Sequence, residues 1–292
     1  MNKEIQIGNR IISENSPVYI IAEMSANHNM DFNRAKAIIK AAAEAGADAI
    51  KIQTYTPDTI TIDCDDDIFK TQSKIWEGMS LYKLYQMAYT PWEWQSQLQE
   101  YAQKLGLDFF SSPFDFTAVD FLEKLNVPAY KVASFEINDI PLIKKIAGTG
   151  KPIIISTGIA YLEDIDLALR ACNEMGNNDV ILLKCVSAYP APYEEMNLKV
   201  ISNMSQTFGC IAGLSDHTLG AETSIASVAL GGKVIEKHLT LRRSDGGPDA
   251  VFSMEPEEFK QMVEQVRNVE KALGRVTYKL NARQKENRTG AR

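Results

Sequence analysis

Short apolar runs rich in β-branched residues alternate with longer amphipathic segments along the whole chain. Apolar runs of this length predict buried strands, and apolar residues at helical spacing predict amphipathic helices. The predicted strands are 18–24, 49–55, 108–114, 129–135, 152–158, 180–187, 210–217 and 234–240. The predicted helices include 32–46, 92–106, 117–126, 162–176, 222–232 and 255–274, several of which end in the glycine that often terminates a helix.

Eight such strands in strict alternation with helices indicate a parallel sheet and favour a closed (β/α)8 TIM barrel. The length of 292 residues suits one barrel of this kind. A doubly wound open sheet is the alternative, but no GxGxxG motif follows the first strand. Residues 4–13 alternate around a Gly-Asn turn, which predicts a short N-terminal β-hairpin before the barrel.

Two segments interrupt the alternation. Residues 56–90 form a long connection after the second predicted strand, and an insertion on that side of a barrel usually builds a wall or lid. Its aromatic residues are expected either to pack the insertion or to flank a sugar. Residues 276–292 are polar, with five basic side chains against one glutamate, and are interpreted as a linker or tail. We therefore assign residues 1–275 to the hairpin and the barrel.

Composition narrows the class of protein. A hydrophobic fraction of 45% and a charged fraction of 24% are those of a soluble globular protein. The net charge of -7 argues against a nucleic-acid or an anionic membrane surface. There is no signal peptide and no membrane-length apolar run, and the four cysteines lack metal-type spacing. Cys185 lies in an apolar run, where a thiol packs as a small hydrophobe. We expect a cytoplasmic, reduced protein.

Polar residues gather at the carboxyl ends of the predicted strands, which converge on one mouth of a barrel. Lys51 and Gln53 share one face of their strand. Lys131 and Ser134 are an odd number of residues apart and would face opposite sides of a regular strand, so one of them must lie past a twist or bulge. The sequence does not show which one does. The strand-end polar residues are Glu23, Lys51, Gln53, Ser111, Ser112, Lys131, Ser134, Glu136, Ser156, Thr157, Ser187, Tyr189, Ser215, Asp216, His217, Glu236 and His238.

Two of the three histidines, His217 and His238, end neighbouring predicted strands. Their imidazoles could meet at one Mn²⁺, Zn²⁺, Co²⁺ or Fe²⁺ ion and leave coordination sites open for substrate and water. The alternative is two unrelated, hydrogen-bonded histidines. Glu236 or Asp249 could complete such a metal shell or bind substrate hydroxyls. The third histidine, His28, is expected either to contact substrate or to help cap the following helix.

Two lysines, Lys51 and Lys131, lie inside apolar strands. A buried ammonium group needs a carboxylate partner or an anionic ligand. A structural ion pair is one interpretation. The other is a cradle for phosphate or carboxylate that the lysines form with nearby hydroxyl groups, namely Ser112, Ser134, Ser156 and Thr157.

The motifs AEMSANHN, AIKIQTY, FFSSPFD, YKVASFE, STGIA, YPAPYEEMNL, GLSDHTLG and EKHLT…GPD resemble, in this order, the sialic acid synthase family over nearly the whole chain. The stretch IWEGMSLYKLYQMAYTPWEW is similar to the pseudaminic acid synthase branch. The resemblance implies a barrel that condenses phosphoenolpyruvate with an amino-sugar aldehyde. In this branch a 2,4-diacetamido-2,4,6-trideoxy hexose would give pseudaminic acid, a nonulosonic acid, and inorganic phosphate.

The resemblance also implies residue roles. His217 and His238 would hold a divalent metal, with Mn²⁺ expected first and Mg²⁺, Co²⁺ or Zn²⁺ as alternatives, that polarises the aldehyde oxygen. The expected catalytic residues, with Glu23 in proton transfer, are Glu23, Lys51, Lys131 and Glu136. The expected substrate-binding residues are Gln53, Ser112, Ser134, Tyr189, Ser215 and Asp249.

The chain also departs from the family pattern. Met30 stands where the family often has glycine, and Ser187 stands where sialic acid synthases have asparagine. Family members continue into an antifreeze-like C-terminal domain that supplies an arginine to the partner's site in a homodimer. We expect this domain to be absent here, with weak or absent turnover and with metal and phosphoenolpyruvate binding retained.

Three alternatives to a pseudaminic acid synthase remain open. The first is a synthase for N-acetylneuraminate or legionaminate. The second is a catalytically silent barrel that binds phosphoenolpyruvate or a sugar. The third is a class I aldolase in which Lys131, on a barrel strand, forms a Schiff base with the substrate.

Overall fold

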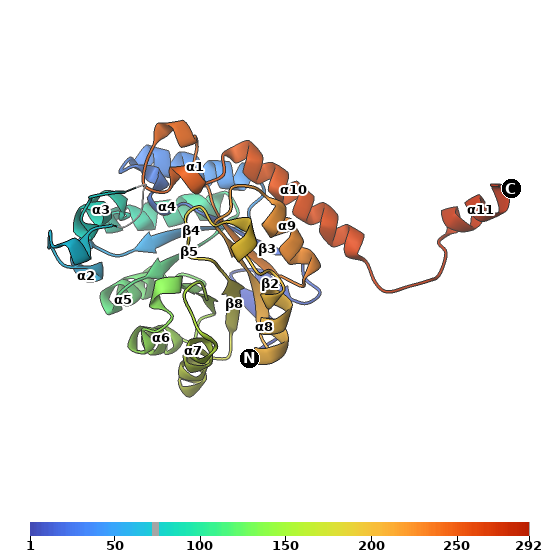
Figure 1. Cartoon of the computed structure of the whole chain (residues 1–292), viewed down its shortest axis with the longest axis horizontal. Coiled ribbons are helices and arrows are strands. Elements are labelled where there is room, and N and C mark those ends of the chain that lie inside the picture. Colours follow the sequence, from blue (N-terminus) through green and yellow to red (C-terminus); the bar gives the residue numbers. More distant parts are fainter. Residues whose placement is uncertain (72–75, 292) are drawn as a thin grey trace.

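The computed structural model describes residues 1–71 and 76–291, which form a closed barrel of eight parallel strands (Figure 1). Its strands, in spatial order, are β10 (Val234–His238), β3 (Tyr19–Glu23), β4 (Ala49–Thr54), β5 (Asp108–Pro113), β6 (Tyr130–Val132), β7 (Ile153–Ser156), β8 (Val180–Lys184) and β9 (Ile211–Asp216). Each strand lies within one of the eight predicted ranges. The predicted TIM barrel is therefore confirmed.

One long helix follows each strand, and Figure 1 shows these helices packed around the outside of the barrel. In chain order they are α1 (Phe32–Glu44), α4 (Trp92–Lys104), α5 (Phe116–Lys124), α6 (Ile140–Ala147), α7 (Leu162–Glu174), α8 (Val200–Phe208), α9 (Glu222–Ala229) and α10 (Pro256–Leu273). Asp31 and Asp115 begin α1 and α5 by accepting hydrogen bonds from backbone N–H groups of the first turn.

The barrel strands are buried on both faces, as parallel strands covered by helices should be. Alternation along β4 separates two environments. Ile50 and Ile52 are fully buried in the apolar core, whereas Lys51 between them meets charged side chains of other strands. Polar residues at alternate positions near the strand ends therefore lie inside the barrel, at its carboxyl-terminal mouth.

The predicted N-terminal hairpin is present and lies at the opposite end of the barrel. Strands β1 (Glu4–Ile7) and β2 (Arg10–Ser13) pair antiparallel. Arg10 contacts Asp48, which precedes β4, at 3.4 Å, and Asp108, which begins β5, at 3.0 Å. The hairpin thereby covers the amino-terminal ends of the strands, and it buries Ile5, Ile7 and Ile12 against them.

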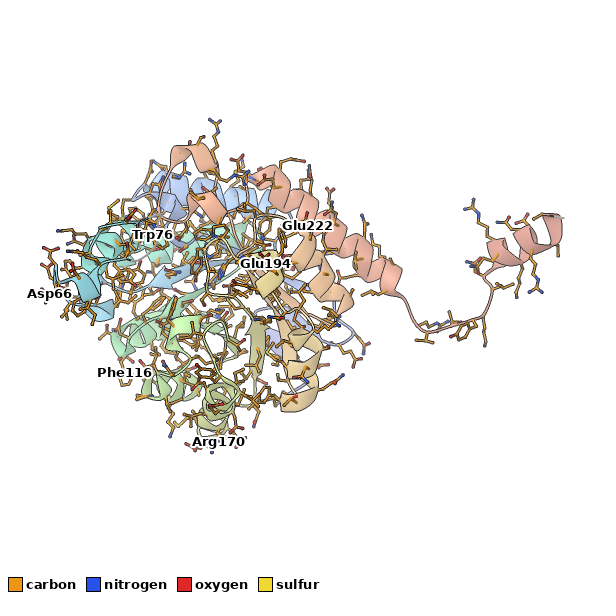
Figure 2. The ribbon with its side chains drawn as sticks, viewed as in Figure 1. Asp66, Trp76, Phe116, Arg170, Glu194 and Glu222 are labelled. Carbon is orange, nitrogen blue, oxygen red and sulfur yellow. The ribbon has the colours of Figure 1, made fainter. Side chains whose placement is uncertain are left out.

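The long connection after β4 contains α2 (Pro57–Ile60) and α3 (Leu81–Ala88), while residues 72–75 of it lie outside the described part of the chain. Trp76, labelled in Figure 2, donates a hydrogen bond from Nε1 to the carbonyl oxygen of Pro248 at 3.1 Å. Pro248 belongs to the loop after β10. The insertion therefore contacts another loop of the barrel mouth.

The chain after α10 extends away from the barrel, and its side chains lie clear of the rest of the molecule (Figures 1 and 2). It contains a helix, α11 (Ala282–Gly290), that the sequence did not predict. Asn281 accepts a hydrogen bond from the backbone of Gln284, whose side chain accepts one in return, and this capping box begins the helix. Within residues 1–71 and 76–291, no helix is both long enough and apolar enough to cross a membrane.

Candidate active site

Lys51 lies at the centre of a buried ionic cluster inside the barrel mouth. Its Nζ is 2.6 Å from Oε2 of Glu23 and 3.5 Å from Oε1 of Glu236, and it donates a hydrogen bond to Oγ of Ser112 at 3.2 Å. The four side chains come from β4, β3, β10 and β5, and all are buried. The expected strand-end residues are thus brought together, and the ion-pair interpretation of Lys51 also holds.

Glu236 connects this cluster to the second lysine. Its Oε1 is 3.8 Å from Nζ of Lys131 and accepts a hydrogen bond from Oγ of Ser215 at 3.4 Å. Lys131 also donates to the carbonyl oxygen of Val132 at 3.2 Å. The sequence had suggested Glu236 only as a metal or sugar ligand. The contact of Glu236 with both lysines appears only in the folded chain.

Burial and mutual charge set the pKa values of this cluster. Burial, opposed by Lys51 and reinforced by Glu236, raises the pKa of Glu23 to about 7. Burial acts in the same direction on Glu236, but Lys131 and Lys51 outweigh it and lower the pKa of Glu236. Burial lowers the pKa of Lys131. Two lysines thus face one carboxylate held ionised and one that titrates near neutrality, an arrangement that favours binding of an added anion.

Serine hydroxyls extend the cluster along the mouth. The 3₁₀ turn η3 (Ser134–Glu136) follows the end of β6, so Ser134 no longer obeys strand parity, which resolves the conflict with Lys131. Oγ of Ser134 accepts a hydrogen bond from the backbone N–H of Gly158 at 3.1 Å. The hydroxyl oxygens of Ser156 and Ser187 are buried without a partner among the described residues. Buried orphan hydroxyls at the end of a barrel mark a place for a polar ligand.

Three further expected site residues lie around the cluster. Burial, opposed by Lys131, raises the pKa of Glu136 to about 7, and its Oε2 is buried without a hydrogen-bond partner in residues 1–71 and 76–291. Gln53 is half-buried, two residues beyond Lys51 on β4. Oδ2 of Asp249 accepts a hydrogen bond from the backbone N–H of Ala26 at 3.3 Å, which ties the last loop to the segment after β3.

The paired histidines lie side by side at the ends of β9 and β10. The ring centroids of His217 and His238 are 5.3 Å apart. The ring of Tyr189 packs against His217 at 4.5 Å, and that of Phe252 packs against His238 at 4.9 Å. Phe252 was not expected from the sequence, because it lies in a loop turn with no periodic pattern. The two histidines are neighbours at the barrel mouth, and a cation shared between them stays a prediction.

The two imidazoles fit a divalent cation. Nδ1 of His217 is 3.0 Å from the carbonyl oxygen of Val186 and therefore donates, which leaves Nε2 available as a ligand. Nδ1 of His238 is buried without a partner among the described residues, and burial holds the pKa of this ring well below its ordinary value. Metal ligation requires a neutral imidazole of this kind.

Two observations limit the site that the protein itself can provide. Within residues 1–71 and 76–291, no group of three or more histidine, cysteine, aspartate or glutamate side chains is arranged to hold a metal. Burial lowers the pKa of His217, but Cys185, whose Sγ is 3.8 Å from Nδ1, outweighs burial and raises it. A cation held by the two histidines would take its remaining ligands from substrate or water.

The third histidine has a structural role. His28 is fully buried, and its Nδ1 accepts a hydrogen bond from the backbone N–H of Met30 at 3.1 Å. Its Nε2 is 3.2 Å from the hydroxyl of Thr90, and its ring packs edge-on against Trp94. His28 holds the loop after β3 against the insertion, and Asp31 rather than His28 caps α1.

The fold and the site together define a barrel enzyme with two buried lysines beside a pair of histidines. Comparison with known proteins agrees: residues 38–278 match the model of the NeuB family. The chain is 47% identical to pseudaminic acid synthase of Helicobacter pylori, over 93% of this chain and 80% of that protein. It is 46% identical to pseudaminic acid synthase of Campylobacter jejuni, over 99% and 83%.

A solved structure gives the same result at the level of the fold. N-acetylneuraminic acid synthetase from Leptospira borgpetersenii, in complex with citrate, superposes with a TM-score of 0.86 at 32% identity, and the match covers 98% of this chain and 95% of that one. The protein belongs to the NeuB family, the sialic acid synthases, and within it to the pseudaminic acid synthase branch.

Proposed function

We propose that the protein condenses phosphoenolpyruvate with a 2,4-diacetamido-2,4,6-trideoxy hexose to give pseudaminic acid and inorganic phosphate. The observation that carries this proposal is the buried contact of Glu236 with both Lys51 and Lys131, beside the paired histidines. The identity of 46–47% to pseudaminic acid synthases over nearly the whole chain selects this product within the family.

Phosphoenolpyruvate has a carboxylate and a phosphate, and the cluster offers two ammonium groups to neutralise them. Lys51 and Lys131 would each contact one anionic group, as charge-assisted hydrogen bonds favour. The neighbouring donors would be the hydroxyls of Ser112, which contacts Lys51, and of Ser215, which contacts Glu236. Ser134, in the turn after β6, would be a third donor. The ring of Tyr189, packed on His217, would form the apolar side of the pocket.

We assign a divalent cation, with Mn²⁺ as the first choice and Mg²⁺, Co²⁺ or Zn²⁺ as alternatives, to His217 and His238. When bound, such a cation supplies Lewis acidity at the aldehyde oxygen of the sugar. The protein's contribution is the fixed spacing of the two rings and the neutral state of His238. Asp249 and Gln53, at the edge of the cluster, would hold the sugar hydroxyl or amide groups.

The reaction also needs a proton carrier. The enolpyruvyl methylene carbon attacks the aldehyde carbon, water adds at the carbon that bears phosphate, and phosphate then leaves. Water loses a proton in this sequence, and the aldehyde oxygen gains one. Glu23, whose pKa is raised to about 7 and whose Oε1 is buried without a partner among the described residues, suits this transfer. Glu136, with a similar pKa, would act on the opposite side of the cluster.

We further propose that a second subunit covers the mouth, as in a homodimer. Successive loops at this end of the barrel each expose a large apolar side chain, namely Phe116, Phe135, Tyr161, Tyr193, Leu219 and Val251, each about half exposed or more. Large apolar side chains exposed on successive loops at one end of a molecule favour a protein interface. Sedimentation should show a dimer that Phe135→Ser weakens and that Leu167→Ser, on the outer face of α7, leaves intact. A monomeric parent protein would contradict this.

The compartment is the remaining proposal. All four cysteines are free, and three of them are buried. Free thiols suit a reducing compartment, so we propose the cytoplasm.

The test of the function is phosphate release from ¹³C-labelled phosphoenolpyruvate, followed at high enzyme concentration with three aldehydes in parallel. We expect release, and a new nonulosonic acid in the ¹³C spectrum, to be fastest with the 2,4-diacetamido-2,4,6-trideoxy hexose of pseudaminic acid. Preference for N-acetylmannosamine or for the legionaminic acid precursor would assign the chain to another synthase. Calorimetric binding of phosphoenolpyruvate without phosphate release from any sugar would indicate a silent binding protein.

The lowered pKa of Lys131 is also a property that a Schiff-base lysine needs, so the aldolase alternative has its own test. Borohydride treatment in the presence of pyruvate or phosphoenolpyruvate should leave the protein mass unchanged. A reduced adduct on Lys131 would replace the proposed mechanism with that of a class I aldolase.

A further inference from the structure

The strand ends that carry the two histidines have a second polar pair on their outer face. Alternation turns Ser215 and His217 inward and Asp216 outward, and it does the same for His238 and Lys237 on the next strand. Asp216 and Lys237 are register partners of β9 and β10, and Nζ of Lys237 is 3.0 Å from Oδ2 of Asp216. Both side chains are fully buried.

Asp216 holds the backbone on both sides of His217. Its Oδ1 accepts hydrogen bonds from the backbone N–H of Thr218 at 2.9 Å and from the hydroxyl of Thr218 at 2.8 Å, which closes a turn around His217. Its Oδ2 accepts from Thr223 at 2.7 Å and from Ser224 at 2.6 Å, both in the first turn of α9. Asp216, which directly precedes His217, is therefore ion-paired to a neighbouring strand and hydrogen-bonded to a turn and to a helix.

Lys237 provides the link from the other strand. Besides Asp216, its Nζ contacts two carbonyl oxygens of the β9–α9 loop, that of Thr218 at 2.6 Å and that of Gly220 at 2.8 Å. The ammonium group thus has partners for all three of its protons. Lys237 directly precedes His238. Its contacts therefore connect the backbone of His238 to the turn that contains His217.

We propose that the Asp216–Lys237 pair is a positioning clamp that fixes the spacing of His217 and His238 for a shared divalent cation. The inference rests on the metal site assigned under the proposed function. Neither residue touches the pocket, since both point toward α9 and its loop. A metal site needs its ligands held to within about 0.5 Å, and a buried network with every member bonded supplies that rigidity.

The test compares Asp216→Asn with Asp48→Asn. Asp48 lies at the opposite end of the barrel, where it accepts from the backbone N–H of Ile20 at 2.9 Å and from Arg267 at 2.9 Å. Both variants break a charged network that joins two barrel elements, so both should lose stability. Mn²⁺ affinity, measured from the electron paramagnetic resonance signal of free Mn²⁺, should fall by about 10- to 100-fold in Asp216→Asn only.

A metal-free measurement separates this inference from the metal assignment. The chain has three histidines, so ¹³C labelling at the imidazole Cε1 position alone gives three resonances, one for each ring. In the metal-free protein, Asp216→Asn should shift or broaden the signals of His217 and His238 and leave that of His28 in place. Wild-type protein that retains no Mn²⁺ would refute the metal assignment, while these signals would still decide whether the clamp positions the rings.

The inference is overturned if Asp216→Asn binds Mn²⁺ as the wild type does, or if Asp48→Asn loses as much affinity. If Asp216→Asn does not fold, Thr223→Val and Ser224→Ala remove one hydrogen bond each from the same carboxylate. Each should weaken Mn²⁺ binding by a smaller factor, about threefold to fivefold, and unchanged affinity in both would count equally against the clamp.

Discussion

Replacement of Glu136 by glutamine should stabilise the protein at alkaline pH and should impair the proposed reaction. The carboxyl group is largely buried, its Oε2 has no hydrogen-bond partner among the described residues, and burial, opposed by Lys131, raises its pKa to about 7. The ordinary value is 4.5. Ionised Glu136 therefore destabilises the folded state, and a neutral amide of the same shape removes that effect.

The pKa difference gives the magnitude. At about 1.4 kcal/mol per pKa unit, a rise from 4.5 to about 7 corresponds to about 3 kcal/mol. The folded protein binds this proton more tightly than the unfolded chain does, so the stabilising contribution of protonation is complete below the unfolded pKa of 4.5. It is lost as the pH rises through about 7, and above that Glu136→Gln should exceed the wild type by up to about 3 kcal/mol.

Urea unfolding, followed by circular dichroism at several values between about pH 5 and about pH 9, measures this difference directly. The control is Glu4→Gln, at an exposed position of β1, which should show no such pH-dependent gain. The reasoning is refuted if Glu136→Gln is no more stable than the wild type at about pH 9, or if its advantage is equally large at about pH 5.

Three other substitutions test separate parts of the structure. Lys131→Met should weaken phosphoenolpyruvate binding by about 100-fold in calorimetry, because it removes a charge-assisted contact; a loss below threefold would exclude Lys131 from the pocket. Trp76→Phe removes the hydrogen bond to Pro248 and should raise KM for the sugar about fivefold without changing KM for phosphoenolpyruvate; equal changes in both would contradict a role in the sugar wall. Ile7→Ala should lower the free energy of unfolding by about 2–5 kcal/mol, and a change in Mn²⁺ affinity would contradict its assignment to the far end of the barrel.

The barrel strands could be predicted from the sequence because each is a short apolar run that the fold buries on both faces, as in residues 152–158. Helix α8 was harder to predict. It has several serine, asparagine and threonine residues of low helix propensity, and it is held mainly by the burial of Ile201 and Met204. Helix α11 buries none of its residues among the described part of the chain, and its capping box is its local signal.

The sequence predicts which polar residues lie at the strand ends, but not which of them are in contact. Period-two alternation put Lys51 and Gln53 on one face of their strand, and a barrel brings the strand ends of Lys51, His217 and His238 together. The contact of Glu236 with both lysines depends on distances across the barrel that no local pattern encodes. The packing of Phe252 against the histidines was unpredictable for a similar reason, because a loop turn carries it to the mouth.

The central claim is that the paired histidines hold a cation next to a lysine pocket that holds phosphoenolpyruvate. A crystal soaked with Mn²⁺ and phosphoenolpyruvate, with anomalous data recorded near the manganese edge, tests it most directly. The account predicts one strong anomalous peak between His217 and His238, with the phosphate and the carboxylate in contact with Lys51 and Lys131. A peak elsewhere, or phosphoenolpyruvate bound away from these lysines, would contradict it.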